Sequence, residues 1–120
     1  MINEYKFGEI SIDDIKYNHD VEVRWTDEVL PWPRKESHII DTEDVLRAIE
    51  QSPETIVIGT GESGLAEVTE DVQSEIRGHG IELIIDNTEQ AVRTFIVLND
   101  DSEEEEGRQK KVIGLFHLTC

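Results

Sequence analysis

The stretch that decides the fold of this chain is residues 55–64, which read TIVIGTGESG. The run from Thr55 to Ile58 is apolar and β-branched, which predicts a strand buried on both faces, as in a covered parallel sheet. The glycines that follow predict a tight turn where this strand ends. Two more apolar runs, residues 81–85 and 112–118, predict strands of the same kind.

Helical patterns separate these strands. Thr42, Thr69 and Asn87 are predicted N-caps, and apolar residues recur after each of them at helical spacing. Pro53 ends the first of these helices, since proline cannot continue a helix. The order strand–helix–strand–helix–strand predicts right-handed crossovers between parallel strands, with helices covering the sheet.

The first forty residues are predicted to be rich in β-structure. Short apolar sets between polar turns indicate an antiparallel meander. Residues 21–26 alternate apolar and polar side chains, which is typical of a strand with one face in solvent. Pro31 and Pro33 lack the N–H groups that a central strand needs, so the segment around them is predicted to be a rigid connector.

We therefore expect a single α/β domain of three layers over residues 1–120. Residues 1–40 would form a β-rich extension with the N-terminal antiparallel meander. Residues 41–120 would form the core, a βαβαβ unit whose helices cover a mixed central sheet. Within the core, residues 99–111 contain an acidic run, which is predicted to be a solvated loop because its carboxylates repel one another.

Charge and composition exclude several classes of function. The 120 residues include 28 Asp and Glu against 11 Lys and Arg, a formal net charge of -17. This acidity opposes binding to nucleic acid, which depends on clustered cations, and no apolar run is long enough to span a bilayer. The only cysteine, Cys120, excludes an intramolecular disulfide and fits a reducing compartment. We predict a cytoplasmic protein without nucleic-acid binding or membrane insertion, and the oligomeric state stays open.

Residues 59–64 also match the dinucleotide-binding pattern G-x-G-x-x-G, and Asp86 ends the next predicted strand. Three features argue against a nucleotide. The following helix is predicted to begin only near Thr69, too late for its first N–H groups to reach a pyrophosphate. Glu62 places a negative charge in the loop, and the chain is too short for both halves of a dinucleotide fold. We predict no cofactor.

The sequence predicts no catalytic residues and no metal ligands. Strand alternation places His117 on the face opposite to Cys120, which disfavours a Cys–His dyad. The four histidines are scattered, without the spacing of a metal site. These features favour a chain that is not an enzyme, and the enzymatic alternative stays open.

Two groups of residues are candidates for binding. The carboxyl ends of parallel strands share one rim, where α/β sheets bind their ligands. The rim candidates are Gly59, Thr60, Gly61, Thr88 and His117. The connector candidates are Trp32, Arg34 and His38, where the proline-flanked indole is either a lid over the core or an exposed anchor for a partner.

Several short motifs together resemble a small single-domain family that was long labelled as having no known function. These motifs are Phe7-Gly8, Trp32-x-Arg34 with His38, VIGTG at 57–61, Gly80-Ile81, TEQAV at 88–92, Gly107-Arg108 and HLTC at 117–120. The family includes archaeal and bacterial proteins, a vertebrate adipogenesis-associated protein and a mitochondrial complex I assembly factor. One departure is Phe95-Ile96, which stands where the family usually has Tyr-Asn.

The resemblance implies a β-extended α/β fold with a mixed sheet and no settled catalytic activity, since its characterised members are assembly or regulatory factors. Our leading hypothesis is a non-enzymatic binding or assembly-type domain that acts through an unidentified protein partner. The alternative is a pocket for a small anionic metabolite, or an unrecognised enzyme, at the glycine-loop rim. Arg34 or Arg93 would then supply the counter-charge.

Overall fold

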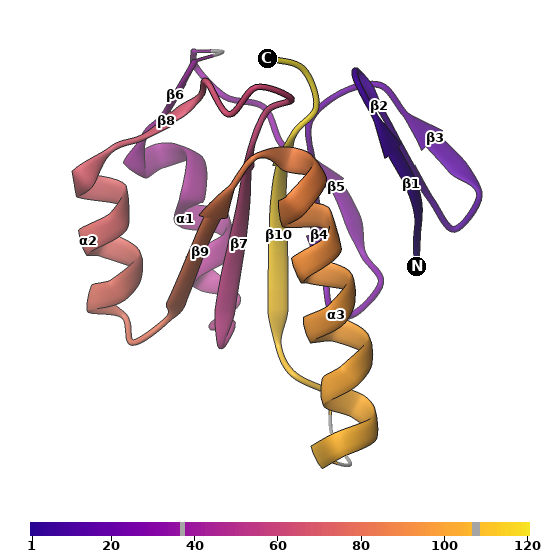
Figure 1. Ribbon diagram of the computed structural model, residues 1–120. Coiled ribbons are helices and arrows are strands. Elements are labelled where there is room, and N and C mark those ends of the chain that lie inside the picture. Colours follow the sequence, from indigo (N-terminus) through magenta and orange to yellow (C-terminus); the bar gives the residue numbers. More distant parts are fainter. Residues whose placement is uncertain (37, 107–108) are drawn as a thin grey trace.

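The computed structural model describes residues 1–36, 38–106 and 109–120. Within these ranges the chain forms helices α1 (Thr42–Glu50), α2 (Glu70–Gly78) and α3 (Thr88–Glu106) (Figure 1). The strands are β1 (Ile2–Lys6), β2 (Glu9–Ile12), β3 (Ile15–Tyr17), β4 (Val21–Arg24), β5 (Val29–Pro31), β6 (Ile39–Ile40), β7 (Thr55–Thr60), β8 (Glu67–Val68), β9 (Glu82–Asp86) and β10 (Val112–His117). None of the described helices is both long enough and apolar enough to cross a membrane.

The central sheet has five strands in the order β5-β4-β10-β7-β9. Strand β7 runs parallel to β9 and β10, and β4 runs antiparallel to β10, which confirms the predicted mixed sheet. Strands β1, β2 and β3 form the predicted antiparallel meander as a separate sheet. The predicted β-rich extension is thus divided, since β4 and β5 belong to the central sheet.

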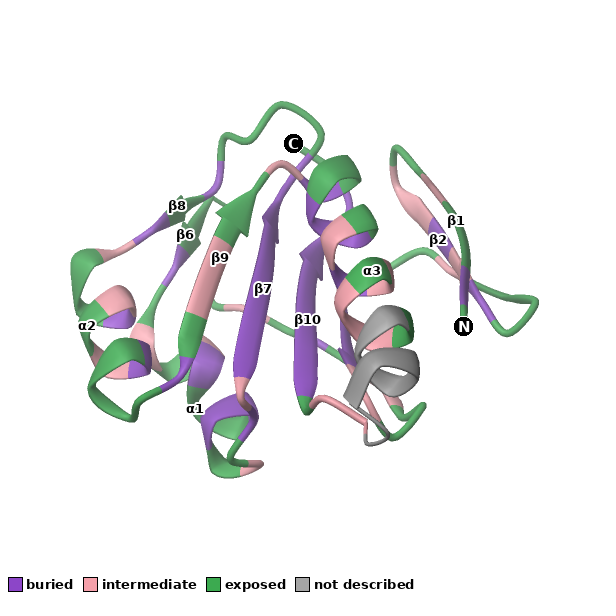
Figure 2. Cartoon of the chain, turned by 60° about the horizontal axis from the view of Figure 1, so that its bottom comes forward, coloured by how far each residue is buried: buried purple, intermediate pink, exposed green. Residues whose placement is uncertain are grey.

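Each face of the central sheet has its own apolar core. Helices α1 and α2 cover one face, where Val45 and Ile76 pack with Ile58 of β7. Helix α3 and the three-stranded sheet cover the other face, where Phe95 and Ile10 pack with Val57 of the same strand (Figure 1). Strands β7 and β10 are buried along their whole length because both faces are covered (Figure 2).

The helix starts follow local sequence closely. Thr69 caps α2, accepting a hydrogen bond from the Val72 N–H, and Asn87 caps α3, accepting one from the Gln90 N–H. The prediction for α1 was wrong by one residue. Its N-cap is Asp41, because Asp41 and Asp44 form a reciprocal capping box that Thr42 could not complete.

Two predicted loops are shorter than expected. Gly59 and Thr60 belong to β7, since they continue its pairing with β10. Helix α3 continues to Glu106, so residues 99–106 of the acidic loop predicted at 99–111 lie within the helix bounds. Once a helix is anchored on a sheet, each further residue adds a hydrogen bond, and glutamate has a high helix propensity. Residues 107–108 of that predicted loop lie outside the described residues.

The face of β4 that was predicted to lie in solvent is buried. Glu22 is only 1 % exposed, under α1. Its carboxylate accepts hydrogen bonds from the Arg24 Nε at 2.7 Å and the Arg47 Nε at 3.0 Å. Alternation thus predicted the strand correctly but misassigned its polar face, because a buried charge is tolerated where partners surround it.

Removing one partner of Glu22 should be costly. We expect Arg24→Ala to lower the free energy of unfolding by about 3 kcal/mol, because it leaves a buried carboxylate with incomplete compensation. Urea denaturation at neutral pH measures this change. The matched control is Arg93→Ala, which breaks an exposed pair with Glu89 and should cost at most ~0.5 kcal/mol. Equal effects of the two variants would contradict this view of Glu22.

Candidate functional site

The carboxyl ends of β7, β9 and β10 gather at one rim, as predicted from the parallel strands. The Thr60 hydroxyl donates to the Asp86 carbonyl at 3.0 Å, which ties β7 to β9. The Gly61 N–H donates to Thr88 Oγ1 at 2.8 Å, and the Thr88 hydroxyl donates to the His117 carbonyl. Residues from three distant parts of the sequence therefore meet at this rim.

The rim is filled by the chain itself. Gly61 has a φ of +103°, and a Cβ added there would lie 2.6 Å from the Cys120 carbonyl oxygen. A Cβ on Gly59 would lie 2.8 Å from Thr88 Oγ1. The Glu62 N–H, which a phosphate-binding loop would offer to its ligand, donates to the Thr119 carbonyl instead. The glycines thus let the C-terminal residues pack closely against β7.

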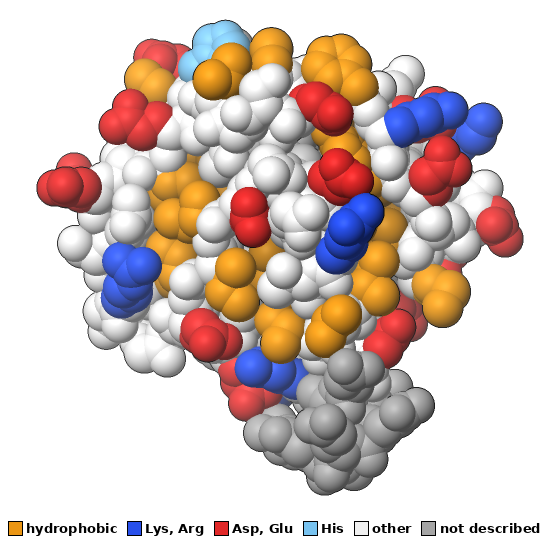
Figure 3. Space-filling view, in the orientation of Figure 1, with side chains coloured by type: hydrophobic (Ala, Val, Ile, Leu, Met, Phe, Trp, Pro, Cys, Tyr) orange, Lys and Arg blue, Asp and Glu red, His pale blue; other side chains and the backbone are white. Residues whose placement is uncertain are grey.

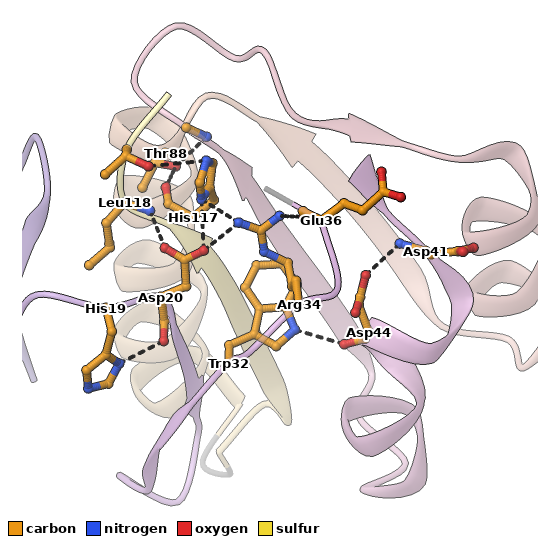
Figure 4. Close-up of polar contacts among 12 residues, drawn as sticks. His19, Asp20, Trp32, Arg34, Glu36, Asp41, Asp44, Thr88, His117 and Leu118 are labelled. Carbon is orange, nitrogen blue, oxygen red and sulfur yellow. Dashed lines mark hydrogen bonds and ion pairs between the residues drawn. The ribbon is translucent and has the colours of Figure 1, made fainter. Parts of the chain in front are cut away.

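A hollow does lie beside the connector that follows β5. We call it the connector groove; its volume is about 440 Å³. Its lining residues are His19, Asp20, Pro31, Trp32, Pro33, Arg34, Lys35 and Glu36. Two of the three predicted connector residues, Trp32 and Arg34, therefore line one concave surface, and Figure 4 shows their side chains next to each other. The third, His38, is exposed outside this lining, and its carbonyl accepts a hydrogen bond from the Glu67 N–H.

The sequence left two alternatives for Trp32, a lid over the core or an exposed anchor for a partner. The structure shows a buried lid, so the hypothesis of an exposed anchor was wrong. The residue is 3 % exposed and packs in the core beneath α1 and α2. Its indole N–H donates to the Asp44 carbonyl at 2.8 Å, and its backbone N–H donates to the Asp20 carbonyl at 2.9 Å. Trp32 thus fixes the connector to the body of the domain, and little of its side chain is left exposed for a partner to contact.

Arg34 binds a carboxylate, as its chemistry suggested, but the carboxylate belongs to this chain. Its Nη2 lies 2.6 Å from Asp20 Oδ2, and its Nη1 donates to the Glu36 carbonyl at 2.9 Å. The guanidinium also stacks over Trp32, 5.2 Å from the ring centroid. Arg34 is therefore held in one geometry along the floor of the groove.

The sequence analysis missed Asp20, which connects the two candidate groups. Its Oδ2 lies 2.8 Å from His117 Nδ1, and its Oδ1 accepts the Leu118 N–H at 2.9 Å (Figure 4). His117 Nδ1 also lies 2.6 Å from Arg34 Nη2, so His117 contacts the connector through its ring and the rim through its carbonyl. Only its place in a short polar turn before β4 marked Asp20 in the sequence, and that signal is common to many surface turns.

The electrostatic state of Asp20 follows from these contacts. Burial alone would raise the pKa of its carboxyl, but the hydrogen bonds with His117, Arg34 and the Leu118 N–H outweigh burial and lower that pKa. Asp20 is therefore an ionised carboxylate near neutral pH, compensated by Arg34. Such a group holds neighbouring side chains in place and is a poor proton acceptor.

The fold resembles that of several solved structures. The conserved hypothetical protein PH1505 from Pyrococcus horikoshii superposes with a TM-score of 0.81 at 20% identity, covering 100% of this chain and 99% of its own. A protein named MT938 gives 0.75 at 23% identity, covering 100% and 98%. A protein described as an outer membrane protein from Bartonella henselae gives 0.77 at 22% identity, covering 99% and 94%. At these identities the likeness concerns the fold alone.

A family model matches residues 2–116 of this chain, which is nearly its whole length. The family is described as a protein of unknown function (DUF498/DUF598).

Filling the close contact at Gly61 should destabilise the domain. We expect Gly61→Ala to lower the free energy of unfolding by about 2 kcal/mol or more, because alanine is strained at positive φ and its methyl group would meet the Cys120 carbonyl. Thermal denaturation measures this effect. Gly78→Ala is the matched control, since its added methyl group meets open space at a helical position and should raise stability by less than ~1 kcal/mol. A neutral Gly61→Ala variant would contradict the closed rim.

The lowered pKa of Asp20 predicts a pH dependence of stability. Because the folded pKa lies below the unfolded one, this contribution is complete above the unfolded value of about 4 and is lost as pH falls through the folded pKa. We expect the free energy of unfolding to fall less steeply below about pH 4 in Asp20→Asn than in the wild type. Urea denaturation at several pH values tests this, with the exposed Asp14→Asn as control. Parallel curves for all three proteins would refute it.

Proposed function

Because this chain belongs to the DUF498/DUF598 family, whose description assigns no function, we propose its function from its own geometry. It is a non-enzymatic, assembly-type binding domain of the cytoplasm that recognises a segment of a partner protein at the connector groove. The observation that carries this proposal is the open groove of about 440 Å³ over a floor whose side chains are already fixed.

The rigidity of the groove supports a role in binding. Pro31 and Pro33 restrict the backbone on either side of Trp32, which is itself anchored to α1 through Asp44. Arg34 is held from below by Asp20 and from the side by Glu36. A surface that is ordered before its partner arrives loses little conformational entropy on binding, so more of the contact energy contributes to affinity.

The chemistry of the groove suits a peptide segment. Pro31 and Pro33 are exposed apolar groups, while the exposed Lys35 and Glu36 provide charges of both signs at the edge. Lys35 also pairs with Glu43 at 2.7 Å. Apolar walls with a polar edge are the usual composition of a protein-recognition surface. The ionised and compensated Asp20 supports a role in binding over a role in proton transfer.

Surface variants of the groove test the proposal. We expect the charge exchange Lys35→Glu/Glu36→Lys to weaken partner binding by about tenfold, because it reverses the charges at the groove edge and conserves net charge. Partners are first identified by quantitative affinity purification from the source cells. Each candidate is then purified, and its Kd is measured by calorimetry against the wild type and the variant.

The matched control is Lys16→Glu/Glu4→Lys, which makes the same exchange on the exposed three-stranded sheet. It should bind every genuine partner with unchanged Kd, and both variants should keep the wild-type melting temperature within a few degrees. If the groove exchange leaves all Kd values unchanged, or if the control weakens them equally, the connector groove is not the recognition surface.

A further inference from the structure

Strand β9 forms one edge of the central sheet, with β7 on its inner side (Figure 2). The Glu82 N–H donates to the Glu54 carbonyl at 3.0 Å, and the Asp86 carbonyl accepts the Thr60 hydroxyl. The main-chain groups of alternate residues, starting at Glu82, therefore point toward β7. In a strand the residues between them point the opposite way, so the N–H and C=O groups of Leu83 and Ile85 face the outer edge.

The side chains of β9 have an apolar centre and acidic ends. Leu83 and Ile84 are partly buried in the two cores, and Ile85 is 38 % exposed. Hydrophobic side chains are visible in the region of β9 in the space-filling view (Figure 3). Glu82 and Asp86 are exposed at the two ends, and Lys110 Nζ lies 3.7 Å from Glu82 Oε1. Asp86 is therefore the less compensated of the two acids.

This charge pattern opposes pairing with a second copy of the chain. An antiparallel pair that keeps both Leu83 and Ile85 paired within the bounds of β9 sets Leu83 opposite the partner's Ile85, with the two-fold axis at Ile84. The same register sets Glu82 opposite the partner's Asp86, twice in the dimer. Like charges directly opposite each other on paired strands are destabilising.

We propose that the outer edge of β9 is a strand-addition site for a basic partner segment, in which apolar residues are flanked by lysine or arginine. The outward groups of Leu83 and Ile85 supply main-chain hydrogen bonds, and Ile85 supplies apolar contact. Glu82 and Asp86 select the flanking cations and exclude a second copy. The overall charge of -17 favours the approach of any basic segment.

This site lies at the opposite edge of the central sheet from the connector groove. The groove begins where β5 ends, and the strand order places β5 and β9 at the two edges of the sheet. Occupation of one site therefore does not block the other, and the proposal for β9 stands or falls independently of the function proposed for the groove.

A designed peptide pair tests the site directly. The probe is acetyl-Lys-Val-Thr-Val-Lys-amide, and its counterpart has Glu at both ends. We expect the Lys peptide to bind the wild type about tenfold more tightly than the Glu peptide, because two cross-strand charge pairs change sign. Nuclear magnetic resonance titration gives both affinities. Binding should also slow amide exchange at Leu83 and Ile85, while Ile84, which points toward β7, is already protected.

Variants of the protein test the same charge pairs by reversing the charges on β9. Glu82→Lys/Asp86→Lys should prefer the Glu peptide, whereas Glu4→Lys/Glu50→Lys, with the same net charge but distant exposed sites, should keep the wild-type preference. The absence of Lys-peptide binding to the wild type, a preference that follows net charge alone, or shifts that avoid β9 would each overturn the proposal.

A single charge reversal tests the exclusion of a second copy. Asp86→Lys places opposite charges face to face twice in the two-fold pair, so this variant should form dimers at lower concentration than the wild type. The double variant restores like charges and should return to the wild-type behaviour. Sedimentation equilibrium measures the difference, and identical association of all three proteins would show that the acidic ends do not control pairing at this edge.

Discussion

The arrangement of this domain depends on the contacts of one side chain, the carboxylate of Asp20. It receives the Arg34 guanidinium from the connector, and the His117 ring and Leu118 N–H from the end of β10. Its own backbone carbonyl accepts the Trp32 N–H. Asp20, which directly precedes β4, therefore joins the connector to the central strand of the sheet. Because the carboxylate is partly buried, its negative charge requires these partners, and their positions are fixed by that requirement.

The contacts of Asp20 determine the geometry of both the strand-end rim and the connector groove. Holding His117 in place positions the last residues of the chain, which then close over Gly61 and fill the strand-end rim. A ligand site of the usual α/β kind is replaced there by contacts within the chain. The concave surface is displaced to the connector, where Arg34 and Trp32 form the floor of the groove. A partner that binds the groove would therefore contact a surface whose shape is set by the core.

The two proposed surfaces differ in the chemistry that they offer. The connector groove is a preformed hollow with charges of both signs at its edge, whereas the β9 edge offers main-chain hydrogen-bonding groups between two acids. Their separation by the width of the sheet would allow one molecule to hold two partner segments at once. Such a bivalent arrangement gives a physical meaning to an assembly role, because it raises the effective concentration of one partner near the other.

Local sequence by itself determined the strands β7, β9 and β10, the caps Thr69 and Asn87 and the parallel order of the core. These features depend on side-chain periodicity and on hydrogen bonds within one helical turn, so a window of a few residues contains the information. Only the tertiary structure decided that Glu22 is buried, that Trp32 is a lid and that Asp20 joins Arg34 to His117. Those residues are far apart in the chain, and their meeting depends on the register of β4 against β10, which no local pattern encodes.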